Sequence, residues 1–162
     1  MIENSEELIK DFVKAAWQAG YDLNVESIMH EPQPAPHRPH SLPSGKCAVY
    51  VFSLKSTQGC SCPAGANRVL KVGRVGPNSN ARFQSQHYNP KSAKSNLSAT
   101  LIKSRIFWHY LGIESIDETS AGIWIKDNLD RDNFYMDATK EKLLGELEKY
   151  LRGRLGPVFE GG

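Results

Sequence analysis

The sequence predicts an α+β fold in which a short central, mostly antiparallel β-sheet is flanked by helices. Residues 46–54 and 68–76 are rich in β-branched and aromatic side chains, as strands are. Near both ends of the chain, apolar residues recur instead at the three- and four-residue spacing of an amphipathic helix. A length of 162 residues suits one domain, and a composition that is 40% hydrophobic and 23% charged is typical of a folded chain.

The chain begins with a predicted amphipathic helix, which a proline-rich connector separates from the core. Asn4 and Glu7 have the spacing of a capping box in front of the first helical stripe. Five prolines between residues 32 and 45 fix φ and remove backbone donors, which favours an extended connector. The expected regions are therefore an N-terminal helix region (residues 1–31), the connector (residues 32–45) and the core domain (residues 46–162). Whether the first two pack on the core, mediate a homodimer or touch DNA stays open.

The core domain is expected to alternate strands and helices. Its first two strands predict a hairpin whose loop, residues 56–67, is longer than most hairpin loops. The elements expected after the hairpin are a short helix (81–88), a longer helix (about 96–110), a third strand (122–126), a segment ambiguous between loop and strand (127–138) and a last helix (139–154). Gly156 and Pro157 end the last helix.

Membrane insertion and secretion are both disfavoured. No apolar run approaches the roughly 18 residues that span a bilayer, and the amino terminus carries acids where a signal peptide carries bases. Three cysteines are too few, and odd in number, for a disulfide scaffold. We therefore expect a cytoplasmic protein with reduced thiols. Cys60 and Cys62 could join His37 and His40 in a zinc site, but their spacing matches no common zinc pattern.

Positive charge is concentrated in the middle of the chain. The formal net charge is only +2, yet residues 32–113 contain 11 Lys and Arg and no Asp or Glu, whereas both flanking segments are net acidic. A basic block of this kind attracts polyanions and supplies phosphate contacts, which is typical of nucleic-acid binders. A solvated basic surface is the other interpretation.

Four short motifs follow one another in an order that resembles the GIY-YIG endonucleases. The chain has AVY at 48–50 in the first strand, KVG at 71–73 in the second, Arg82 eleven residues after Lys71, and Leu147, Glu148, Leu151 and Pro157 near its end. In that family two adjacent strands carry the motifs GIY and YIG, a following helix carries an Arg and often a His, and a later helix carries a metal-binding Glu. The resemblance covers roughly residues 46–159. Lys71 departs from the Tyr of YIG, and His87 lies five residues after Arg82 instead of four.

The resemblance implies hydrolysis of phosphodiester bonds in DNA with one divalent metal ion. It makes Tyr50 the candidate general base, Lys71 and Arg82 the phosphate contacts, Glu148 the metal ligand and His87 a proton shuttle. The residue types suit these roles: nearby cations favour the phenolate of a tyrosine, an arginine fork holds a phosphate, and Mg²⁺ or Mn²⁺ accepts one carboxylate together with waters. The alternative for Tyr50 is a packing role in the sheet.

Further basic residues are expected to contact the DNA backbone: Arg68, Arg74, Lys91, Lys94 and Lys103. Periodicity does not decide which carboxylate binds metal, because Glu146 and Glu148 flank the apolar stripe of the last helix symmetrically. Only the spacing to Pro157 favours Glu148. Two other functions stay open, a non-cleaving nucleic-acid-binding module of the same fold and an RNase, because a phosphate-centred site does not distinguish the two sugars.

Overall fold

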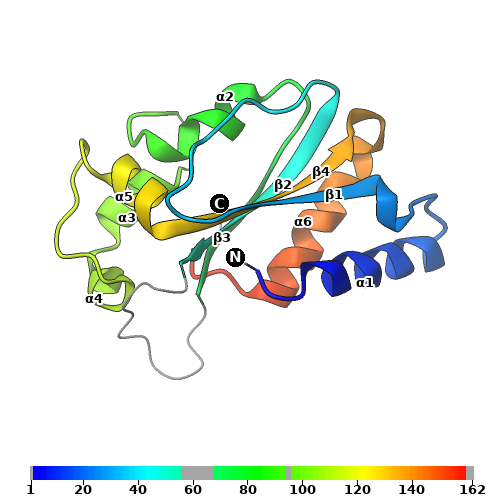
Figure 1. The fold of residues 1–162 in the computed structure, drawn as a ribbon, viewed down its shortest axis with the longest axis horizontal. Helices are drawn as coiled ribbons and strands as arrows, with labels where there is room; N and C mark the ends of the chain where they lie inside the picture. Colours follow the sequence, from blue (N-terminus) through cyan, green and yellow to red (C-terminus); the bar gives the residue numbers. More distant parts are fainter. Residues whose placement is uncertain (1, 56–67, 94–95, 160–162) are drawn as a thin grey trace.

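An antiparallel sheet of four strands forms the middle layer of this protein (Figure 1), in a computed structural model that describes residues 2–55, 68–93 and 96–159. The order across the sheet is β1-β4-β2-β3, so β1 and β3 are the edge strands. The strands are β1 (Ile28–Gln33), β2 (Lys46–Leu54), β3 (Val69–Val75) and β4 (Leu129–Asp137). The predicted α+β class and the predicted pairing of residues 46–54 with 68–76 are confirmed.

Helices cover both faces of the sheet (Figure 1). One face packs on α1 (Ser5–Gln18) and α6 (Glu141–Leu155). The shorter elements on the other side are α2 (Asn80–Gln84), η2 (Gln86–Tyr88), α3 (Leu97–Lys103), η3 (Arg105–Phe107), α4 (Trp108–Leu111) and α5 (Ala121–Asn128). Two further turns of 3₁₀ helix are η1 (Val25–Ser27) and η4 (Ala138–Lys140).

Two apolar cores follow from the alternation of side chains along the strands. Val49 and Val51 of β2 point into the core beneath α1 and α6, whereas Tyr50 and Phe52 point into the core beneath the shorter helices. All four are fully buried, because β2 lies between β4 and β3. Tyr50 therefore faces the same side of the sheet as α2.

The strand that follows the hairpin, β4, begins at Leu129, seven residues after the start of the strand predicted over residues 122–126. Residues 122–126 belong to α5, so the strand prediction for them was wrong: Ala121 and Ile125 are buried at helical spacing, and five apolar-rich residues are too few to distinguish the two periods. The ambiguous segment contains β4 instead, which pairs with both β1 and β2. Its buried polar residues, Asp130, Arg131, Asp132 and Asn133, hide the strand from any hydropathy pattern.

The helix expected over residues 96–110 is broken into three pieces. Ser104 leaves the helical region, and α3 ends there. The indole Nε1 of Trp108 donates to the carbonyl oxygen of Leu101 at 2.8 Å, a carbonyl that a continuous helix would have offered to the backbone of Arg105. The side chain of Trp108 thus takes over a helical hydrogen bond, and the chain turns.

The connector does not hold the first helix apart from the core. Residues 28–33 form the edge strand β1, in which Pro32 is tolerated because an edge strand has one unpaired side. Further on, the backbone of His37 donates to the carbonyl oxygen of Lys126 and the backbone of Leu42 to Asn80. The predicted capping box is also wrong, since Asn4 adopts a left-handed conformation with φ 62° and its side chain makes no capping bond. Within the described ranges, no helix is long and apolar enough to cross a membrane.

Candidate active site

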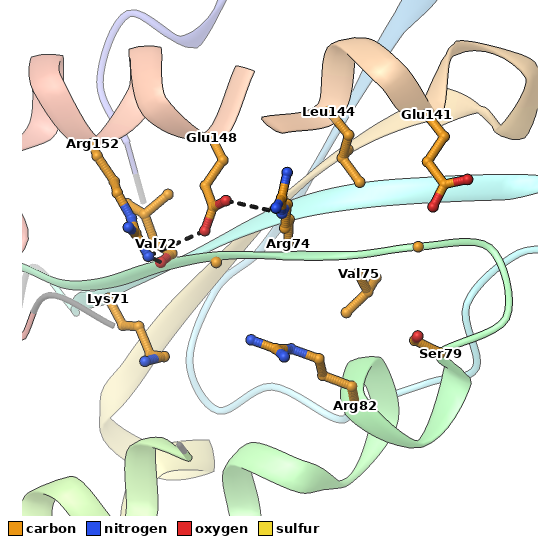
Figure 2. A pocket seen from close by; sticks show the side chains of 12 residues that line it. Lys71, Val72, Arg74, Val75, Ser79, Arg82, Glu141, Leu144, Glu148 and Arg152 are labelled. Carbon is orange, nitrogen blue, oxygen red and sulfur yellow. Dashed lines mark hydrogen bonds and ion pairs between the residues drawn. The ribbon is translucent and has the colours of Figure 1, made fainter. Parts of the chain in front are cut away.

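A pocket of about 560 Å³ lies along the outer edge of β3, between α2 and α6 (Figure 2). Its charged lining residues are Lys71, Arg74, Arg82, Glu141, Glu148 and Arg152. Three residues of the expected catalytic set, Lys71, Arg82 and Glu148, therefore line one pocket although they are separated by up to 77 positions in the sequence. Lys71 comes from β3, Arg82 from α2 and Glu148 from α6.

Successive side chains of β3 point to opposite faces of the sheet, so this strand contributes to two walls of the pocket. Lys71 and Gly73 pair with Phe52 and Tyr50 of β2, so they face the α2 side of the sheet. Arg74 lies on the opposite face and forms an ion pair with Glu148 of α6. Lys71 and Arg82 thus line one side of the pocket, and Glu148 with its two arginines, Arg74 and Arg152, lines the other.

Glu148 is held by two arginines. Its carboxylate oxygens lie 3.2 Å from Nε of Arg74 and 3.1 Å from Nη2 of Arg152, and its side chain is only 14% exposed. Glu146, two residues earlier, is 54% exposed and pairs with Lys149 outside the pocket. Of the two carboxylates that periodicity could not separate, Glu148 is the one that lines the pocket.

Lys71 and Arg82 form the second wall of the pocket. Lys71 is 3% exposed, and burial, together with the charges of Arg82 and Arg152, lowers the pKa of its ammonium group. Nε of Arg82 is buried and has no hydrogen-bond partner among the residues that the structure describes. A buried guanidinium nitrogen without a partner has unused capacity for an anionic ligand.

Tyr50 lies directly beneath Gly73 and has no exposed surface. A Cβ at Gly73 would overlap the hydroxyl group and ring of Tyr50, so only a glycine fits between the Tyr50 hydroxyl and the pocket. Burial raises the pKa of Tyr50, an effect that the charge and hydrogen bond of Arg82 and the charge of Arg131 oppose. The expected base therefore lies under the pocket floor and does not line it.

We expect Gly73→Ala to destabilise the protein by about 1–3 kcal/mol, the usual penalty for overpacking a filled core. The added methyl group meets the ring of Tyr50, which is fully buried and has no space to move. Gly153→Ala is the matched control, since nothing lies within 4 Å of its Cβ position in α6. Urea denaturation measures the free energy of unfolding of both variants. Equal values for the two would contradict the close fit of Gly73 on Tyr50.

His87 lies behind Tyr50 and is fully buried. Its Nδ1 accepts the backbone N–H of Leu97 at 3.2 Å, and its Nε2 lies 2.5 Å from the hydroxyl oxygen of Tyr50. Burial, with the charges of Lys71, Arg131 and Arg82, lowers the pKa of His87 well below its usual value, so the ring is neutral. A neutral ring that accepts at Nδ1 carries its proton on Nε2 and donates it to Tyr50.

Two residues at this site were not found from the sequence. Arg152 lies one helical turn after Glu148, so the i, i+4 spacing could have indicated it. Arg131 of β4 is fully buried behind Tyr50, with its guanidinium carbon 5.5 Å from the centre of the Tyr50 ring. No local pattern could have indicated Arg131, because the segment that holds it was ambiguous between loop and strand.

Of the described residues that were expected to contact the DNA backbone, only Arg74 lines the pocket. Arg68 donates to the backbone carbonyl of Lys55. Lys91 is exposed and pairs with Glu118 at 3.6 Å, and neither it nor the exposed Lys103 lines the pocket. Lys94 lies outside the described residues. A second hollow of about 380 Å³ shares Ser79 and Arg82 with the pocket and continues over α2 to Ser92 and Ala93, next to Lys91.

Glu148 is the lining carboxylate that was expected from the sequence to bind a divalent cation. The described residues contain no group of three or more His, Cys, Asp or Glu side chains that could hold a metal ion. Mg²⁺ or Mn²⁺ does not require such a group, because it retains waters and accepts a single carboxylate such as Glu148 together with a substrate phosphate. The zinc alternative has no described ligand set, since Cys60 and Cys62 lie outside the described residues, while His37 and His40 are bonded to Leu129, Tyr88 and Glu31.

Comparison of the chain with protein-family models, with curated proteins and with solved structures finds no match. The functional argument therefore depends on the pocket and on the groups that surround it.

Proposed function

We propose that this protein is a divalent-metal-dependent endonuclease of GIY-YIG type, which hydrolyses phosphodiester bonds in DNA. The observation that carries the proposal is the meeting of Lys71, Arg82 and Glu148 around one pocket, with Tyr50 directly beneath its floor. These are the residue types that hydrolysis of a phosphodiester requires: cations for the charge on phosphorus, a carboxylate for a metal and a proton acceptor for the attacking water.

The arrangement of the motifs supports the choice of family. AVY and KVG lie on β2 and β3, which are adjacent and antiparallel. Arg82 lies on the helix that follows β3, and Glu148 lies on α6, the last helix. This order of two neighbouring strands, an arginine helix and a glutamate helix is the one that the resemblance implied.

The cations of the pocket would bind the scissile phosphate. Nε of Arg82 is buried with no partner in the part of the chain that the structure describes, so the guanidinium group can present two parallel donors, whereas Lys71 supplies a point charge. Glu148 would hold the metal ion, which lowers the pKa of a water and neutralises charge at the leaving oxygen. Arg74 and Arg152, which now hold Glu148, would then be released to neighbouring phosphates.

Tyr50 would accept the proton of the attacking water. Nε2 of His87 donates a hydrogen bond to the Tyr50 oxygen, and the positive charge of Arg82 also favours the phenolate.

A non-cleaving binding module is the second candidate, because one specific observation favours it. Both oxygens of Glu148 are already engaged by arginines, and Tyr50 has no exposed surface. A module of this kind would use Lys71, Arg82 and the residues along α2 as phosphate clamps. It would bind nucleic acid without any metal ion.

The test is incubation of the purified chain with plasmid DNA and with RNA, each in Mg²⁺, Mn²⁺ or EDTA. We expect DNA to be cut with either metal ion and to stay intact in EDTA, while it remains bound in EDTA with an affinity that falls as salt rises. Binding without cutting in every condition would favour the module, and cutting of RNA alone would favour an RNase. Cutting of DNA in EDTA would exclude the metal-dependent mechanism.

A further inference from the structure

A fully buried arginine lies in the central strand β4, on the side of the sheet that faces Tyr50. Arg131 has no exposed surface, and its guanidinium carbon lies 4.3 Å from the ring centre of Phe83, 5.4 Å from that of Phe52 and 5.5 Å from that of Tyr50. An arginine stays charged in any protein interior, so the protein keeps a full positive charge among three aromatic rings.

The hydrogen-bond partners of Arg131 are neutral. Its Nε donates to Asn133 at 2.9 Å, its Nη1 donates to the hydroxyl oxygen of Tyr88 at 2.9 Å, and its Nη2 is buried with no partner among the described residues. The carboxylate of Glu31 is linked to Arg131 only through Asn133, whose amide nitrogen donates to Glu31 at 3.2 Å. A buried charge without a direct counter-charge is unfavourable. A nearby group that becomes negative during function would remove this penalty.

We propose that Arg131 is a positioning residue that stabilises the negatively charged form of Tyr50, an inference that rests on the proposed function. Arg131 comes from β4 and the pocket lies at β3, on opposite sides of the strand β2 that carries Tyr50, so the guanidinium group lies on the side of Tyr50 away from the pocket. Tyr50 would lose its proton to solvent and then accept the proton of the attacking water. The charge of Arg131 acts in the first of these two steps.

Tyr88 also contacts Arg131, but its surroundings favour the neutral hydroxyl group. Nδ1 of His37 lies 2.7 Å from the carbonyl oxygen of Leu129, which can only accept, so this nitrogen carries the proton. Nε2 of the same ring, 2.8 Å from the Tyr88 hydroxyl, must then accept the Tyr88 proton. Tyr50 differs because its hydroxyl oxygen accepts a hydrogen bond from Nε2 of His87. Of the two, Tyr50 has the environment that suits a phenolate.

The other charged groups around Tyr50 do not replace Arg131. Arg82 of α2 favours the phenolate, but it lines the pocket and would be neutralised by a bound phosphate. Glu148 of α6 disfavours the phenolate, and His87 of η2 is neutral. Lys71 of β3 also lines the pocket, where a phosphate would engage it. Arg131 is the cation next to Tyr50 that the substrate cannot reach, since it is fully buried on the far side of the ring.

The test is a titration of Tyr50 in the full chain. Biosynthetic 3-fluorotyrosine gives each of the six tyrosines its own ¹⁹F resonance, and Tyr50→Phe identifies the one of interest. We expect Arg131→Met and Arg131→Gln to raise the titration midpoint of Tyr50 by about one pH unit or more, the effect of losing a cation within 6 Å. In Arg131→Lys, which keeps the charge, the midpoint of Tyr50 should stay within about half a pH unit of the wild-type value. Circular dichroism at each pH confirms that the variants stay folded.

An unchanged midpoint in both neutral variants would overturn the inference and leave Arg131 with a packing role only. A shift at Tyr88 with none at Tyr50 would overturn it as well. If Arg131→Met does not fold, Arg131→Gln still carries the test, because the glutamine amide can donate to Tyr88. The titration needs no substrate, so the two proposals can fail separately. A shifted midpoint supports the inference about Arg131, whereas a chain that cuts no DNA contradicts the proposed nuclease function.

Discussion

Glu148→Gln is expected to reduce DNA cleavage by about a thousandfold or more. The amide keeps the size of the side chain but removes the negative charge that a divalent ion requires. Arg74 and Arg152 lose their ion-pair partner at the same time, so both become available to phosphates. DNA binding in EDTA should therefore be retained or become tighter. Cleavage kinetics and a binding titration on the same preparation measure the two effects.

Glu146→Gln is the matched control for this experiment. It makes the same chemical change on the same helix, two residues away, but its side chain pairs with Lys149 at the surface and does not line the pocket. Its cleavage rate should stay within about twofold of wild type, as is usual for surface substitutions. Equal losses in the two variants would mean that the overall charge of α6, and not a metal ligand, controls the activity.

Tyr50→Phe is expected to reduce cleavage by about 10²- to 10⁴-fold, the usual contribution of a positioned general base. The ring remains in the core, so the sheet keeps its packing. The Nε2 proton of His87 loses its acceptor, however, which should lower the free energy of unfolding by about 1–3 kcal/mol. Tyr150→Phe is the control, because the Tyr150 hydroxyl is buried without a hydrogen-bond partner in the described part of the chain.

The pH dependence of cleavage provides a second readout for Tyr50. A base acts in its deprotonated form, and burial raises the pKa of Tyr50 above its usual value. At neutral pH the reactive form is therefore a minor one, and kcat/KM at a fixed metal concentration should rise about tenfold per pH unit through the neutral range. Tyr50→Phe should lose most of this slope. A wild-type profile that is flat between pH 7 and 9 would exclude Tyr50 as the base.

The first strand hairpin and the helices at the two ends were predictable because their patterns are local. Val49, Tyr50 and Val51 lie in a run of strand-forming residues, and α6 carries a stripe of leucines at helical spacing. The strand β4 was not predictable in the same way. A strand whose buried side chains include Asp132 and Asn133 forms only because distant residues satisfy them, such as His30 and Glu31 of β1.

By itself the sequence determined the α+β class, the pairing of the first two core strands and the residue types that suit a phosphate-centred site, since all of these follow from the spacing of side chains along the chain. Only the tertiary structure decided that Glu148 and not Glu146 lines the pocket, that Tyr50 lies beneath Gly73, and that Arg131 is buried behind Tyr50. The physical reason is that burial and charge pairing depend on which distant segments meet. Periodicity fixes the face of a strand or helix on which a side chain lies, but not the side chains that it contacts across the core.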